Sequence, residues 1–341
     1  MTPTRTEASV QEICALSKNV YALRLKPAKA FCFKPGQHVL VGIQEGGPQR
    51  CYSMAGAAMP DGLIELHIRK WTGGAFSDLA LSSLASGQSV DLSGPFGDFM
   101  FPDGDKQVLM LATGTGIAPF KAMLETYLPV SGERSIVLYW GGRTLADFYM
   151  LPQLELWQNR YKNFRFSLVC SGLGQGYVQD AARNKLKDLS GINVLACGNP
   201  RMIQDAKKIF ATDMAGAPAL FSSDPFDAAG LYETELADAG ARTIELFVNG
   251  ARIEVKGGQT LLAALKAANY PIMSVCRGKA ACGTCAVELE PESRAIVKAP
   301  DRTEANLLSC LPDIHAGSRL ACQINLTADS DGLTISMPMK Q

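Results

Sequence analysis

The sequence predicts a multidomain chain: an antiparallel β-barrel, an α/β domain with a parallel sheet, and a small α+β unit. Its first hundred residues hold short apolar or alternating runs separated by turn residues, a pattern typical of antiparallel barrels. From about Gln107, apolar runs alternate with helical periods, which is typical of a parallel sheet. In the last hundred residues, a hairpin pattern around Asn249-Gly250 precedes a helical period and indicates the third unit.

Each domain is predicted from runs of this kind. Barrel strands are expected at 20–25, 39–43 and 63–68, and a helix after 71–78. Strands of the α/β domain are expected at 108–112, 135–140, 164–169 and 193–197. The third unit is expected to pair 243–248 with 251–255 and to form a helix over 260–269. We expect domains at 1–104, 105–226 and 243–341. Because residues 227–242 are small, acidic and rich in Ala and Gly, we expect them to form a linker between the second and third domains.

Composition restricts the class of protein. The 341 residues carry 33 basic and 33 acidic side chains, which argues against a nucleic-acid-binding protein that works by bulk charge. No stretch is apolar enough to cross a bilayer, and the first residues lack the apolar core of a signal peptide. We therefore expect a cytoplasmic protein that contacts neither membrane nor nucleic acid. We also expect it to be a monomer. In a reducing compartment, its ten cysteines are expected to be thiols or metal ligands rather than disulfides.

Four cysteines stand in a pattern that predicts a metal centre. Cys276, Cys282 and Cys285 lie in one loop with the spacing C-x5-C-x2-C, and Cys322 follows a long gap. A structural zinc site usually pairs two close CxxC or CxxH segments, whereas only one CxxC is present here. The loop is rich in Gly, Ala and Thr, so its backbone amides can stabilise the negative charge of cluster sulfurs. The pattern favours an iron–sulfur cluster, with zinc or plain thiols as the alternative.

A second set of residues suits a flavin. Arg50, Tyr52 and Ser53 supply a cation, an aromatic ring and a hydroxyl, which we expect on one side of a strand. Residues 74–77, Gly-Ala-Phe-Ser, can present N–H groups and a hydroxyl to a pyrophosphate, and Arg69 adds positive charge nearby. R-x-Y-S also arises by chance in an ordinary strand, so the flavin interpretation depends on residues 74–77 and Arg69 as well.

A third set suits a dinucleotide. Gly114, Thr115, Gly116 and Ile117 follow a buried run and open a helix, where small residues let backbone amides approach a pyrophosphate. The residues from Cys197 to Met202 follow the fourth apolar run, and we expect them at the same sheet edge.

Taken together, these motifs resemble two known families. Over residues 10–226, the elements F-x-P-G-Q, R-x-Y-S, G-x-x-S, G-T-G-I-A-P and C-G-x-P resemble the ferredoxin–NADP⁺ reductase superfamily. Residues 241–337 resemble [2Fe–2S] ferredoxins of β-grasp fold, and the x5 spacing looks more like the adrenodoxin type than the plant type. The run from Gly94 to Phe99 looks like that of the FAD-binding members, so FAD is favoured over FMN.

The resemblance implies a role for each of these residues. The flavin contacts it implies are Arg50, Tyr52, Ser53, His67, Ile68, Arg69, Gly74, Phe76 and Ser77, with His67 acting through its backbone. The nicotinamide dinucleotide contacts it implies are Gly114, Thr115, Gly116, Ile117, Arg143, Cys197 and Gly198. Cys197 is implied to lie against the nicotinamide, with a buried core thiol as the alternative. We expect the other two histidines, His38 and His315, at the surface.

The end of the α/β domain carries two further candidates. The resemblance implies that Phe226 covers the flavin ring and that Asp224 joins Ser53 and Cys197 at the reactive edge of the flavin, where they form the catalytic group. The alternative is a plain domain exit, with Pro225 ending the strand. Arg143 is placed to meet a 2′-phosphate and favours NADPH, whereas oxygenase reductases of this architecture mostly use NADH, which we take as the prediction.

The predicted function is an electron-transfer reductase. Electrons pass from NAD(P)H through FAD and a [2Fe–2S] cluster to a terminal oxygenase component. A Rieske non-haem iron oxygenase is favoured, and a di-iron hydroxylase or a cytochrome P450 remains open. The alternatives are a diaphorase that reduces quinones or free flavins and a redox-sensing cluster protein.

Overall fold

The computed structural model describes residues 4–43, 49–58, 61–70, 77, 81, 84–226, 243–274, 278, 280, 283–309, 311 and 314–337. Two compact units form: the first comprises chiefly Pro3–Pro48 and Tyr52–Phe226, and the second chiefly Asp227–Gln341. Within the described residues, no helix is long and apolar enough to cross a membrane.

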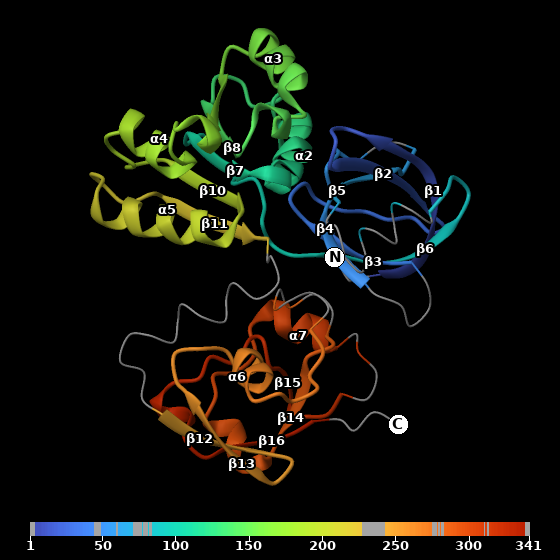
Figure 1. Ribbon diagram of the computed structural model, residues 1–341, viewed down its shortest axis with the longest axis vertical. Helices are drawn as coiled ribbons and strands as arrows, with labels where there is room; N and C mark the ends of the chain where they lie inside the picture. Colours follow the sequence, from blue (N-terminus) through green and yellow to red (C-terminus); the bar gives the residue numbers. More distant parts are fainter. Residues whose placement is uncertain are drawn as a thin grey trace. The chain divides into compact units, whose positions relative to one another are not determined.

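The first unit begins with a six-stranded antiparallel sheet, drawn from dark blue to cyan in Figure 1. Its strands are β1 (Thr4–Ala15), β2 (Val20–Pro27), β3 (His38–Gly42), β4 (Gln49–Ser53), β5 (Ile64–Arg69) and β6 (Ser89–Phe96). Their order is β4-β3-β6-β1-β2-β5, and a bridge between Met54 and Leu66 joins the two ends, so that the sheet nearly closes into a barrel. Apolar side chains such as Val10, Leu23 and Val41 fill its interior.

The three barrel strands expected from the sequence are confirmed as β2, β3 and β5, and the strand expected around Arg50 to Ser53 is β4; β1 and β6 are additional. β1 has no continuous apolar run, because only alternate residues such as Ala8 and Val10 face the core. β6 contains Gly94 and Pro95, which read as turn residues. The helix expected after 71–78 lies largely outside the described residues, although Ser77 and Leu81 are helical.

A five-stranded parallel sheet forms the rest of this unit. Its strands, in the order β11-β10-β7-β8-β9, are β7 (Val108–Thr113), β8 (Ile136–Gly142), β9 (Phe164–Cys170), β10 (Asn193–Gly198) and β11 (Leu220–Pro225). The connecting helices are α2 (Ile117–Tyr127), α3 (Leu151–Arg160), α4 (Val178–Lys185) and α5 (Pro200–Thr212), with short 3-10 turns η1 (Gly114–Gly116), η2 (Leu145–Asp147) and η3 (Ser171–Leu173).

Helices cover both faces of this sheet, which explains why its strands are apolar throughout. On β7, Met110 packs into the core shared with α2 and α3, whereas its neighbour Leu109 packs into the core shared with α4 and α5. The four strands predicted from the sequence are confirmed, and β11 adds a fifth at the edge beside β10. Because β7, β10 and β11 are parallel, their last residues, Thr113, Gly198 and Pro225, lie together at the carboxyl ends of the strands. This side of the sheet is called its carboxyl edge.

The second unit contains a mixed five-stranded sheet. Its strands, in the order β13-β12-β16-β14-β15, are β12 (Thr243–Val248), β13 (Ala251–Lys256), β14 (Ala286–Leu289), β15 (Ser318–Leu320) and β16 (Leu333–Ser336). The helices are α6 (Leu261–Ala267) and α7 (Arg302–Leu308), with 3-10 turns η4 (Pro291–Ala295) and η5 (Ala328–Ser330). The predicted hairpin is confirmed, since Val248 pairs with Ala251 and both Asn249 and Gly250 have positive φ.

Candidate functional site

Three buried polar side chains meet where the barrel contacts the parallel sheet. Ser53 ends β4, and its hydroxyl donates a hydrogen bond to Asp224 Oδ2 at 3.3 Å. Cys197 on β10 pairs in register with Asp224 on β11, and its Sγ lies 4.0 Å from the same carboxylate oxygen. All three are less than 9% exposed. The structure thus brings together the three residues that the sequence named as a catalytic group.

The other flavin candidates on β4 are arranged differently from the prediction. Successive residues of a strand point to opposite faces, so Ser53 does not lie on the side shared by Arg50 and Tyr52. The expectation that all three share one side is therefore wrong for Ser53. Tyr52 is half-buried and packs against the barrel core. Arg50 Nη1 donates to the carbonyl of Gln49 at 2.7 Å.

Two glycines at the carboxyl edge of the parallel sheet form a cradle that a side chain would fill. A Cβ at Gly116 would lie 2.3 Å from the carbonyl oxygen of Cys197, and one at Gly198 would lie 2.3 Å from Thr113 Oγ1. Gly198 also has φ +123°, which residues with a Cβ rarely adopt. The backbones of η1 and the end of β10 therefore approach as closely as a dinucleotide pyrophosphate site requires. Ile117 packs in the core, so only its backbone can face this cradle.

Arg69 reaches the same cradle from the barrel. It lies at the end of β5, and its Nη1 is 3.4 Å from the position that a Cβ of Gly114 would take. Its Nη2 lies 3.7 Å from Asp147 Oδ1. A cation from the barrel therefore stands beside the turn predicted to hold a pyrophosphate. Ser77 is buried, whereas Gly74 and Phe76, two of the predicted phosphate contacts, lie outside the described residues.

The histidines differ in their surroundings. His67 is buried, with Nε2 3.1 Å from Glu65 Oε1 and Nδ1 3.0 Å from the hydroxyl of Tyr149. Its neighbour Ile68 is fully buried in the barrel core, so both can offer only their backbones to a flavin. His38 is 5% exposed, so the expected surface position is wrong, because β3 is buried throughout. His315 is exposed, as predicted.

The two remaining cofactor candidates, Arg143 and Phe226, follow the carboxyl ends of β8 and β11. Arg143 is exposed, and its backbone N–H, like that of Thr144, donates to Asp147 Oδ2. Asp147 thus caps the turn after β8. Phe226 is half-buried against the core that contains Cys197, and its N–H donates to the carbonyl of Gly198 at 2.6 Å.

Two of the predicted cluster ligands are described. Cys285 comes directly before β14 and Cys322 shortly after β15, and both are buried. The two strands pair antiparallel, and the N–H of Ala321 donates to the carbonyl of Cys285 at 3.0 Å, so both cysteines lie at the same end of the strand pair. Gln323 Nε2 lies 3.3 Å from Cys322 Sγ. The pair fits the thiolate set of a [2Fe–2S] cluster, while Cys276 and Cys282 lie outside the described residues.

A buried ion pair holds the segment before Cys322. Arg319 Nε and Nη2 each lie 2.9 Å from one carboxylate oxygen of Glu304, and the N–H of Leu320 donates to Glu304 Oε1 at 2.7 Å. Arg319 Nη1 also donates to the carbonyl of Lys298. The pair ties α7 to β15, three residues from a predicted cluster ligand. No local sequence motif predicts this ion pair.

Comparisons with known proteins agree with this arrangement. Three family models match in order: an oxidoreductase FAD-binding domain over 7–101, an oxidoreductase NAD-binding domain over 110–208, and a 2Fe-2S iron-sulfur cluster binding domain over 246–327. Protein RfbI of Salmonella typhimurium is 32% identical over 236 residues, which cover 67% of this chain and 70% of the relative.

Two further proteins are similar in sequence or in fold. The terephthalate 1,2-dioxygenase reductase component 2 of Comamonas sp. is 31% identical over 222 residues, which cover 63% of this chain and 65% of that protein. The crystal structure of phthalate dioxygenase reductase matches with a TM-score of 0.59 and 17% identity, over 98% of each chain, and so shows the fold.

Fold, sites and comparisons define an NAD(P)H-dependent flavin and iron–sulfur oxidoreductase. The chain belongs to the ferredoxin–NADP⁺ reductase superfamily, among the members that carry a [2Fe–2S] ferredoxin domain. The predicted fold class and the predicted FAD, NAD and [2Fe–2S] domains are confirmed.

Proposed function

We propose that this protein passes electrons from NADH through FAD and a [2Fe–2S] cluster to a terminal oxygenase component. The hydrogen bond from Ser53 of the barrel to Asp224 of the parallel sheet carries the proposal, because it joins the two predicted cofactor sites in one buried polar group. The similarity to a dioxygenase reductase component supports the choice of partner. Residues 1–104 then hold the flavin, 105–226 the dinucleotide and 243–341 the cluster.

The proposed chemistry assigns simple tasks to the protein. When bound, FAD accepts electrons as a pair and releases them singly to the cluster. The Ser53 hydroxyl, which donates to Asp224, would place its proton beside a bound flavin, and the small Cys197 would leave room for a nicotinamide ring. Gly116 and Gly198 keep the backbone open to the pyrophosphate. Burial of the three polar groups would keep water away from a flavin and a nicotinamide bound beside them.

The finer assignments are proposals as well. We propose a Rieske oxygenase as the partner, since the terephthalate protein is named as a dioxygenase reductase component. The adrenodoxin-like cysteine spacing keeps a cytochrome P450 as the second candidate. We propose FAD rather than FMN, NADH rather than NADPH, and a monomer.

Serine substitution at a cluster ligand tests the relay. Cys285→Ser is expected to retain flavin reduction by NADH and ferricyanide reduction, but to lose the cluster absorption and the reduction of cytochrome c, a one-electron protein acceptor. The exposed Cys32, in the other compact unit, provides the matched control Cys32→Ser, which should keep every activity. If cytochrome c reduction persisted in Cys285→Ser, electrons would not need the cluster, and a diaphorase would be the better assignment.

A further inference from the structure

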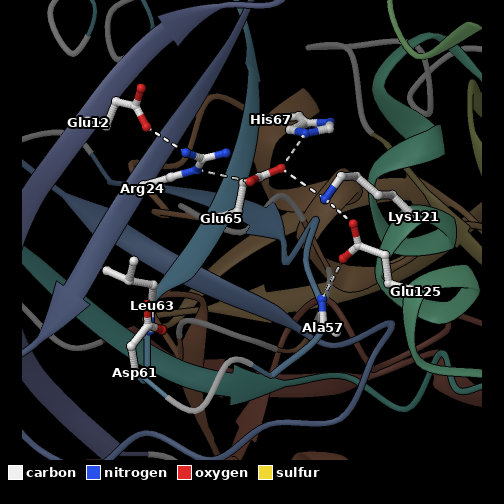
Figure 2. Close-up of polar contacts among 9 residues, drawn as sticks. All are labelled: Glu12, Arg24, Ala57, Asp61, Leu63, Glu65, His67, Lys121 and Glu125. Atoms are coloured by element: carbon white, nitrogen blue, oxygen red, sulfur yellow. Dashed lines mark hydrogen bonds and ion pairs between the residues drawn. The ribbon is translucent and has the colours of Figure 1, made fainter. Parts of the chain in front are cut away.

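Glu65 lies at the centre of a charged network between the barrel and the parallel-sheet domain (Figure 2). On the barrel side, Arg24 Nε lies 3.2 Å from Glu65 Oε2. Across the domain boundary, Lys121 Nζ of α2 lies 3.1 Å from Glu65 Oε1. The Glu65 and Lys121 side chains are 16% and 15% exposed, so solvent screens their attraction less than that of a surface pair.

A second contact fixes the same helix to another part of the barrel. Lys121 Nζ also lies 2.7 Å from Glu125 Oε1, one turn further along α2. Glu125 Oε2 accepts a hydrogen bond from the N–H of Ala57, in the connection between β4 and β5. One helix is thus attached to two barrel segments, and one of them follows Ser53 by four residues.

A third contact runs from His67 to Tyr149, and the direction of its hydrogen bonds can be derived. Burial raises the pKa of Glu65, but the hydrogen bond from His67 and the charge of Lys121 outweigh it and hold the pKa at about 2. The ionised carboxylate can only accept, so His67 Nε2 carries the proton and donates it. Burial lowers the pKa of His67, so its imidazole is neutral and Nδ1 carries no proton. Nδ1 therefore accepts from the hydroxyl of Tyr149, which keeps its proton because burial raises its pKa.

These contacts converge on the dinucleotide cradle. α2, which carries Lys121, begins directly after η1. The ring of Tyr149 stands edge-on to Trp140 at 5.4 Å between centroids, and Trp140 Nε1 donates to the carbonyl of Gly114 at 2.9 Å. A displacement of α2 or Tyr149 relative to β5 would therefore move the turn at Gly114 relative to the barrel.

We propose that Glu65 and His67 are positioning residues, which hold the Gly114–Gly116 turn at a fixed place relative to the barrel edge that carries Ser53. The proposal rests on the proposed function, since it concerns the geometry between nicotinamide and flavin. The two side chains contact Arg24, Lys121, Tyr149 and each other. We expect them to affect the orientation of bound NADH rather than its affinity. A misplacement of the reacting groups by about 1 Å can slow a reaction roughly 100-fold.

Lys121→Met in the FAD-loaded protein tests the proposal. We expect the rate of flavin reduction at saturating NADH to fall roughly 10- to 100-fold, while the dissociation constant of NADH changes less than about threefold. Hydrogen–deuterium exchange without nucleotide gives a readout apart from activity: the amides of residues 114–121 should exchange at least about tenfold faster. Lys121→Arg keeps the charge and should restore most of the rate.

Arg24→Gln is the matched control, because Arg24 contacts the same carboxylate but stays within the barrel. It should leave both the rate and the exchange at 114–121 nearly unchanged. Tyr149→Phe removes only one hydroxyl and gives a second, milder test, with an expected slowing of roughly three- to tenfold.

Three kinetic results and one exchange result would overturn the proposal. The kinetic results are an unchanged rate in Lys121→Met, an equal slowing in Arg24→Gln, and a parallel change in rate and NADH affinity. Unchanged amide exchange at 114–121 would contradict it even if NADH failed to reduce the flavin of the unmodified protein. That failure of reduction would itself overturn the proposed function, so the two outcomes are distinguishable.

Discussion

Replacing Arg319 by methionine is expected to destabilise the ferredoxin domain severely. Glu304 is 1% exposed; its carboxylate loses two charge-assisted hydrogen bonds at 2.9 Å and keeps the one from the N–H of Leu320. Leaving one partner of a buried ion pair uncompensated costs roughly 3–5 kcal/mol. Because small domains are stable by only about 5–15 kcal/mol, the loss should be evident in denaturant.

The assay is urea unfolding followed by the visible absorption of the cluster. Arg252→Met in the same domain is the control, since Arg252 pairs with Glu245 at the surface and should cost no more than about 1 kcal/mol. Glu304→Gln combined with Arg319→Met should recover part of the loss, because no charge is then buried alone. Equal midpoints for the Arg319 and Arg252 variants would refute the reasoning.

Three further predictions concern the first unit. Gly198→Ala should lower the free energy of unfolding of this unit by at least about 2 kcal/mol, because the new Cβ meets Thr113. Gly174→Ala, which has open space around it, should lower it by only about 1 kcal/mol. Similar melting curves for the two variants would contradict this. The pKa of Glu65 is about 2 in the folded protein, against 4.5 ordinarily, so its contribution to the free energy of unfolding is complete above pH 4.5 and is lost as the pH falls toward 2. On acid titration the unmodified protein should therefore lose up to about 3 kcal/mol of stability that Glu65→Gln does not lose. Parallel curves of stability against pH for the two proteins would refute this. Ser53→Ala should slow flavin reduction by NADH roughly 10- to 100-fold in stopped-flow measurements, and an unchanged rate would remove Ser53 from the catalytic group.

The sequence predicted the features that depend on local pattern. The strands of the parallel sheet are apolar because both faces are covered, and Asn249-Gly250 adopts the positive φ values that its hairpin requires. The two glycines of the cradle stood out because each follows or opens a regular element. These signals are local, so one sequence suffices to detect them.

Features that depend on distant residues were missed or misplaced. β1 was missed because its buried face includes Thr6 and the small Ala8, and because a bulge between Val10 and Glu12 interrupts its alternation. His38 was expected at the surface, yet neighbouring strands bury it. The contacts of Glu65 with Lys121 and of Glu304 with Arg319 join residues far apart in the chain. The only available signals were the spacing of Lys121 and Glu125 along a helix and the alternation of Glu65 and His67 along a strand.

Rapid-freeze electron paramagnetic resonance after anaerobic mixing with one equivalent of NADH tests the electron relay most directly. The relay predicts that the signal of a reduced [2Fe–2S] cluster appears within the first turnover, as the flavin gives up its electrons. The same experiment on Cys285→Ser should show flavin reduction without the cluster signal. A cluster that stayed oxidised in the unmodified protein while the flavin was reduced and quinone turned over would contradict the account.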